Sequence, residues 1–125
     1  MSTRDLTLKD FGSTVTGSGI TVVDFWAGWC APCIGFAPVF EAAAQRHPDI
    51  VFGKVDTEAE QQLAASARIS SIPTLMVFRD GVLVFSQPGA LRDPQLEQLI
   101  ENARALDMDD VRRQIAEREA STLAG

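Results

Sequence analysis

A seven-residue run of strand-forming residues constrains the fold of this chain more than any other segment. Ile20–Trp26 is β-branched or aromatic at every position except Asp24, which is the composition of a strand covered on both faces of a sheet. Segments with strand-like and helix-like patterns alternate along the rest of the chain, as they do in α/β domains. The sequence therefore predicts an α/β domain with this run as a central strand.

The other predicted elements follow the same alternation. Before the run, a short strand and a first helix are expected within residues 6–15. After it we expect a helix over residues 31–46, kinked by Pro38 and ended by His47-Pro48, a strand over 50–55 and a short helix over 58–67. Asp80-Gly81 between two apolar runs predicts a hairpin, and an amphipathic helix is expected from Pro94 onward.

The last nineteen residues, 107–125, stand apart from this pattern. The spacing of Met108, Val111 and Ile115 predicts a further short helix. Residues 121–125 are expected to form a frayed tail.

The two cysteines, Cys30 and Cys33, directly follow the predicted central strand. A chain of 125 residues buries enough surface to fold without covalent help, and closing so short a loop constrains the unfolded chain very little. The pair is therefore better explained by reactivity than by stability. Two unreactive core thiols or a zinc site are the alternatives, and zinc is disfavoured because His47 is the single histidine of the chain.

The position of the pair predicts different roles for the two sulfurs. If Cys30 caps the following helix and Pro32 lies in its first turn, the unpaired N–H groups of that turn favour the Cys30 thiolate. Cys30 is then the nucleophile. Cys33, one turn farther on, is placed to attack the mixed disulfide that Cys30 forms with a target.

Asp24 is the outlier of the predicted central strand. A carboxylate in an apolar strand is desolvated, which raises its pKa toward neutrality and suits it to proton transfer. The alternative is a carboxylate at the strand end that turns to solvent.

The net charge and the N-terminal sequence indicate which partners the protein binds and where in the cell it lies. A net charge of −6 disfavours nucleic-acid and anionic-membrane partners. Near Met1 we find no basic leader followed by an apolar core, and no apolar run has the length of a membrane span. We therefore expect a cytoplasmic protein, a setting in which cysteine pairs tend to be catalytic or redox-sensing.

The segment Trp26-Ala27-Gly28-Trp29-Cys30-Ala31-Pro32-Cys33 resembles the active site of thioredoxins. The resemblance covers about residues 5–106 in family order and spacing and includes Ala37-Pro38, Lys54-Val55-Asp56, Ile72-Pro73-Thr74, Asp80-Gly81 and Gly89-Ala90-Leu91. It implies the thioredoxin fold, a central mixed β-sheet of about five strands flanked by about four helices. Residues 1–106 would form this domain, and residues 107–125 a short helical extension and tail.

The resemblance also implies roles for individual residues. Asp24 would assist deprotonation of Cys33, and Lys54 would face Asp24 from the neighbouring strand, although a plain surface lysine is the alternative. A cis bond before Pro73 would expose the Ile72 backbone for strand-like pairing with a substrate. Further residues would complete the docking surface (Trp29, Gly89) or support the site from beneath or within the helix (Trp26, Ala31, Pro32, Pro38).

A function follows from the same resemblance. It implies a protein-disulfide oxidoreductase whose redox centre is the Cys30–Cys33 pair, with no metal and no other cofactor. Protein disulfides would be its substrates, an NADPH-dependent thioredoxin reductase would restore the dithiol, and the chain would act as a monomer. A dedicated reductant of one partner is a second enzymatic possibility, and a thioredoxin-fold client-binding module or chaperone is the alternative from another class.

Three departures from the commonest thioredoxin pattern bear on the redox chemistry. Ala31 stands where the family usually has glycine, which stiffens the loop. Ile34 stands where lysine or arginine is usual, which removes a positive charge near Cys30. The third departure is the extension after Leu106.

Overall fold

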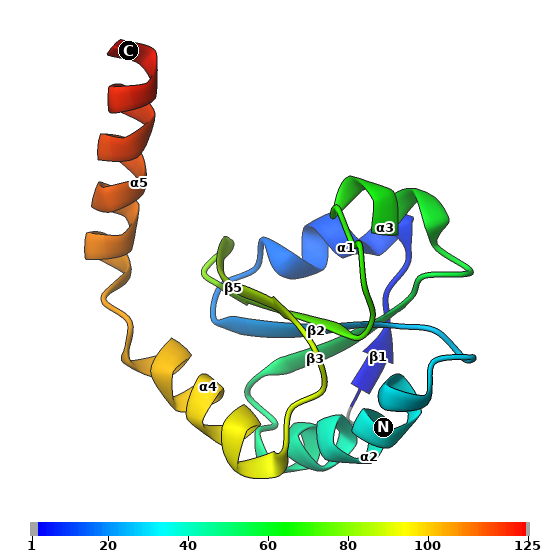
Figure 1. Ribbon diagram of the computed structural model, residues 1–125. Coiled ribbons are helices and arrows are strands. Elements are labelled where there is room, and N and C mark those ends of the chain that lie inside the picture. The colour runs from blue at the N-terminus through cyan, green and yellow to red at the C-terminus, as the bar shows by residue number, and fades with distance from the viewer. Residues whose placement is uncertain (1–2, 125) are drawn as a thin grey trace.

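Five strands form one mixed sheet in the computed structural model, which describes residues 3–124 (Figure 1). In chain order they are β1 (Thr3–Asp5), β2 (Ile20–Trp26), β3 (Val51–Asp56), β4 (Thr74–Arg79) and β5 (Val82–Pro88). Their order across the sheet is β1-β3-β2-β4-β5. β1 and β2 pair with β3 in parallel, β4 runs antiparallel to β2, and β5 runs antiparallel to β4. The predicted fold class is confirmed, with β2 at the centre.

Helices cover both faces of this sheet (Figure 1). The four that pack on it are α1 (Leu8–Val15), α2 (Ala31–Arg46), α3 (Gln61–Ser66) and α4 (Asp93–Ala105). α2 and α4 share a core with Val22 on one face, whereas α1 and α3 share a core with Val23 and Phe25 on the other. Because side chains alternate along a strand, Asp24 lies on the same face as Val22. The alternation of side chains along β2 therefore places this carboxylate on the face of the sheet that α2 covers.

The C-terminal helix, α5 (Met108–Ala124), is longer than predicted. Residues 121–124 are helical, so the expected frayed tail is wrong for them, while residue 125 lies outside the described residues. Met108 is buried and Val111 half-buried, but residues 112–122 are exposed. Figure 1 shows α5 leaving the end of α4 and pointing away from the sheet. Ion pairs along its surface, such as Arg113 with Asp110, support an exposed helix of this kind. Within residues 3–124, no helix is both long and apolar enough to cross a membrane.

Arg79, at the end of β4, anchors the C-terminus of α4. Its Nη1 donates to the backbone carbonyls of Ala103, Arg104 and Leu106 at 2.8, 3.0 and 2.7 Å. The last carbonyls of a helix have no partners within the helix, and they carry the negative end of its dipole. One guanidinium thus caps α4 and fixes the connection to α5.

We expect Arg79→Met to lower the free energy of unfolding by about 1–3 kcal/mol, because the carbonyls lose a charged donor. Chemical denaturation would measure this. Arg112→Met is the control, since Arg112 lies on the exposed face of α5 with only a 3.8 Å pair to Asp109, and such pairs contribute little. Equal effects of the two substitutions would contradict the anchoring role.

Candidate active site

The two cysteines lie at the junction between β2 and α2 and form a disulfide, with their Cα atoms 5.2 Å apart. Cys30 is the N-cap of α2, the residue that flanks its first turn, and Pro32 lies in that turn. The backbone N–H of Cys33 donates to the Cys30 sulfur at 3.2 Å. The expected capping by Cys30 is confirmed, and the N-terminal N–H groups of α2 favour negative charge on this sulfur.

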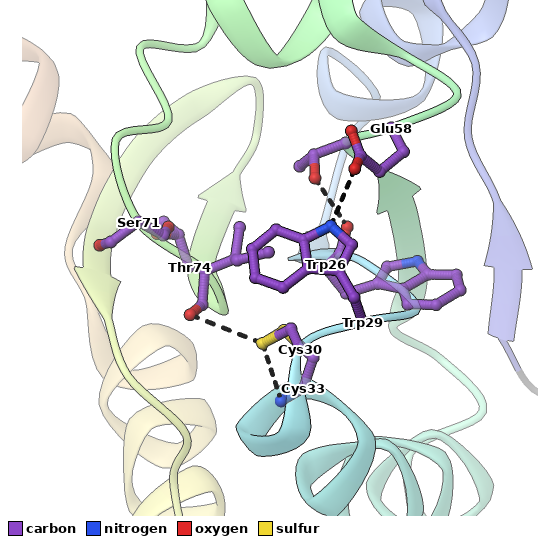
Figure 2. Close-up of a disulfide and its surroundings, with 9 residues drawn as sticks. Trp26, Trp29, Cys30, Cys33, Glu58, Ser71 and Thr74 are labelled. Atoms are coloured by element: carbon purple, nitrogen blue, oxygen red, sulfur yellow. Dashed lines mark hydrogen bonds between the residues drawn. A yellow bond between two sulfur atoms is a disulfide. The ribbon is translucent and has the colours of Figure 1, made fainter.

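The disulfide lies in a small apolar cluster. The exposed fractions of Cys30 and Cys33 are 4% and 2%, and the half-buried side chains of Trp26 and Ile72 pack against them. Figure 2 shows the sulfurs with Trp26 and Trp29 beside them. Since the two exposed fractions are nearly equal, the difference between the two sulfurs comes from their places at the helix N-terminus rather than from exposure.

The loop before β4 approaches the disulfide through backbone atoms. The carbonyl oxygen of Ile72 lies 3.7 Å from the Cys30 sulfur, and the Ile72–Pro73 peptide bond is cis, as the resemblance implies. The Gly89 N–H donates to the carbonyl of Pro73 at 2.8 Å. Gly89 has a φ of +109°, a conformation that favours glycine. Three of the residues expected to dock substrate, Ile72, Pro73 and Gly89, are therefore adjacent in space.

Trp29, the fourth expected docking residue, is the most exposed large apolar side chain near the site, at 70%. Its Nε1 donates to a carboxylate oxygen of Glu58 at 2.8 Å (Figure 2). Glu58 is not among the residues that the sequence predicted for the site. One signal could have found it: β2 and β3 are parallel, so the segments after their carboxyl ends meet at one edge of the sheet.

A groove of about 330 Å³ continues from Trp29 and Ile72. Ile69 and Ala64 supply its other apolar walls, and two serines and a threonine complete the lining (Ser70, Ser71, Thr57). The groove shares Ile72 with the apolar cluster around the disulfide and has room for a side chain of a peptide.

Asp24 is fully buried, with an exposed fraction of 0%. Among the described residues, neither of its carboxylate oxygens has a hydrogen-bond partner. Burial raises its pKa from 3.8 to about 7, and the positive charge of Lys54 opposes this rise. The alternative of a carboxylate turned to solvent is excluded. Near neutral pH this group can both accept and release a proton.

Lys54 lies opposite Asp24 in the register of β2 and β3, so both side chains leave the same face of the sheet. The Lys54 ammonium is also 4.8 Å from the centre of the Trp26 ring, within cation–π range. Its backbone is part of β3, and its side chain is half-buried rather than free in solvent.

The remaining supporting residues belong to α2. Ala31 and Pro32 are exposed in its first turn, and Pro38 lies inside the helix, also exposed. Between Thr3 and Ala124, no group of three or more histidine, cysteine or acidic side chains could hold a metal ion.

Fold and site together define a protein of thiol–disulfide exchange, because a cysteine pair lies at a helix N-terminus beside the backbone carbonyl of Ile72. Comparison with known proteins agrees. The thioredoxin family model matches residues 2–102, and the chain belongs to the thioredoxin family. It is thus a thiol-disulfide oxidoreductase with a redox-active Cys30–Cys33 pair, and a purely client-binding role is not favoured.

Individual thioredoxins are also similar to this chain. The chain is 55% identical to "Putative thioredoxin 2" of Streptomyces coelicolor, over 95% of this chain and 89% of that protein. It is 37% identical to the thioredoxin of Bacillus subtilis over 70% of this chain and 86% of that one. Among solved structures, the thioredoxin of Plasmodium falciparum superposes with a TM-score of 0.73 at 34% identity, over 79% of this chain and 97% of that one. Because the Streptomyces match leaves out only six of the 125 residues, it includes most of residues 107–125.

We expect Asp24→Asn to stabilise the oxidised protein in a pH-dependent way. Asp24 has a pKa of about 7 in the folded state against 3.8 ordinarily, so the folded state holds the proton more tightly. The wild-type free energy of unfolding therefore falls as the pH rises from about 4 to 7, by about 4 kcal/mol from this group, and then levels off. Asparagine does not titrate, so the variant should gain most above pH 7 and little near pH 4.

Denaturant unfolding at pH 4, 6 and 8 would measure this difference. Asp109→Asn is the control, because the Asp109 side chain is fully exposed at the start of α5. Unfolding free energies of wild type and Asp24→Asn that run parallel across this pH range would contradict the assignment.

Proposed function

We propose that this protein donates electrons to protein disulfides, with Cys30 as the attacking sulfur and Cys33 as the resolving one. The observation that carries this proposal is the N-cap position of Cys30, whose sulfur accepts the Cys33 backbone N–H at 3.2 Å. That contact and the helix dipole stabilise a thiolate on Cys30. Among the described residues, no comparable donor contacts the Cys33 sulfur.

The exchange proceeds in two displacements. The Cys30 thiolate attacks one sulfur of the client disulfide, the client S–S bond breaks, and the second client sulfur leaves as a thiolate that takes up a proton. Cys33 then loses its proton and attacks the Cys30 sulfur, which releases the first client sulfur as a thiol. The client gains two electrons and two protons, one proton from Cys33 and the other from solvent, and the Cys30–Cys33 disulfide is the oxidised product.

We propose that the Asp24 carboxylate accepts the proton that Cys33 loses in the second displacement. Burial against the α2 layer and a pKa of about 7 support this role, because a base must match the working pH. Lys54 tunes the same carboxylate, since its charge favours the ionised form.

Client docking is proposed at Trp29, Ile72, Pro73 and Gly89. The Ile72 backbone, close to the Cys30 sulfur, would pair with an extended client segment. Main-chain pairing asks little of client side chains, so one site can serve many disulfides. Trp26 supports the site from beneath, and Ala31, Pro32 and Pro38 shape the first turns of α2.

The same proposal includes the reducing partner, the cofactor requirement, the oligomeric state and the location of the protein. An NADPH-dependent thioredoxin reductase restores the dithiol, no cofactor beyond the cysteine pair is required, and the chain works as a monomer in the cytoplasm. Residues 1–106 form the redox domain, with residues 107–125 as an appendage. The net charge of −6 supports protein clients over nucleic acid or anionic membrane.

We expect wild-type protein to reduce insulin in the presence of dithiothreitol, and both Cys30→Ser and Cys33→Ser to lose nearly all of this activity. Cys30→Ser removes the nucleophile, whereas Cys33→Ser stops at the mixed disulfide. Turbidity of the precipitating insulin chain measures the rate. A Ser121→Ala variant, on the exposed part of α5, serves as the control. Full activity of both cysteine variants would overturn the proposed redox role.

We further expect iodoacetamide to label Cys30 of the reduced protein much faster than Cys33, because thiolates are the reactive form. Mass spectrometry of peptides after short labelling at pH 7 measures the two rates. Equal labelling of the two sulfurs would contradict the proposed division of roles.

A further inference from the structure

We propose that Ile34 is a specificity-determining residue that favours clients with an aliphatic side chain, rather than an acidic one, two residues from the reactive half-cystine. This inference rests on the proposed attack by Cys30 and names a substrate class for it.

The first argument is exposure. Cys30 and Cys33 are almost completely buried, so a client reaches the sulfur only by resting on the side chains around it. Ile34 is 58% exposed, a large apolar side chain open to solvent one residue after Cys33. No packing within the described protein accounts for an isoleucine there, because the core of α2 is built from other positions such as Phe36 and Phe40.

The second argument is geometry. The Ile34 N–H donates to the Cys30 carbonyl at 3.1 Å, so the two residues are related as i and i+4. Residues with this spacing lie on one side of a helix, about 6 Å apart along its axis. In an extended client, side chains two residues apart lie on one face, about 7 Å apart. A client side chain two positions from the attacked cysteine therefore matches the separation between Cys30 and Ile34.

The third argument is charge. The first two turns of α2 carry no charged side chain, so they offer no cation to a client carboxylate. Charged groups that the described residues place near the site are engaged or buried. Glu58 accepts the Trp29 indole N–H, the Lys54 ammonium lies over the Trp26 ring, and Asp24 is fully buried. An acidic client side chain brought against Ile34 loses water without gaining a partner. An aliphatic one buries apolar surface there.

The test uses short peptides, each a symmetric disulfide dimer, with leucine or glutamate placed two residues before or two residues after the cysteine. Wild type, Ile34→Lys and Ile34→Met are compared by kcat/KM at 0.15 M salt, where long-range effects of net charge are screened. We expect wild type to favour leucine over glutamate by about tenfold at one of the two positions. Ile34→Met, an apolar side chain of similar volume, should keep this ratio, whereas Ile34→Lys should abolish or reverse it.

Hydroxyethyl disulfide, a small neutral substrate with no side chain to reach Ile34, reports the thiol chemistry separately. A leucine-to-glutamate ratio that is the same in wild type and Ile34→Lys, with hydroxyethyl disulfide still reduced, overturns the role of Ile34 and leaves the proposed function intact. The absence of any preference in wild type at both positions overturns it equally. Wild type that reduces none of these disulfides refutes the proposed function itself.

Discussion

The pairing of β2 on both of its edges is the constraint on which the site depends. Parallel pairing with β3 brings the segment that holds Glu58 to the carboxyl end of β2, and antiparallel pairing with β4 brings Ile72 and Pro73 to the same end. The disulfide lies where these segments meet. Thr57 adds a further tie, since its N–H and hydroxyl both donate to the Trp26 carbonyl. The active site is thus a product of sheet register more than of any single loop.

Much of this could be predicted from the sequence, because its signals are local. The run Ile20–Trp26, the Asp80-Gly81 turn and the stop at His47-Pro48 each depend on neighbouring residues, and all three are present. The first strand, predicted within residues 6–15, lies earlier instead, at Thr3–Asp5. The Cys30 cap was likewise predictable from Pro32 and the strand before it. The place of Asp24 in an apolar strand left a buried and a solvent-facing carboxylate as alternatives, and the family resemblance favoured the buried one.

What could not be predicted depends on contacts between distant segments. Glu58 lies 29 residues from Trp29, and only the strand order brings them together. The three carbonyls bound by Arg79 belong to the end of α4, far along the chain. The length of α5 was underestimated for a different reason: Ser121 and Thr122 favour caps and turns locally, yet they continue a helix that is already formed. The geometry of the cis bond before Pro73 came from family resemblance and not from the local sequence.

The exposed part of α5 and the central sheet differ in how their backbone hydrogen bonds open to solvent. Its exposed residues, 112–122, lie beyond the last half-buried contact at Val111, so their backbone hydrogen bonds depend on the helix–coil balance of the segment itself. The amides of this part exchange with solvent through local fraying, while those of β2 and its neighbours exchange only when the sheet separates. We therefore expect two scales of stability in one chain: a sheet that holds the sulfurs in register and a terminal helix whose exposed part frays by itself.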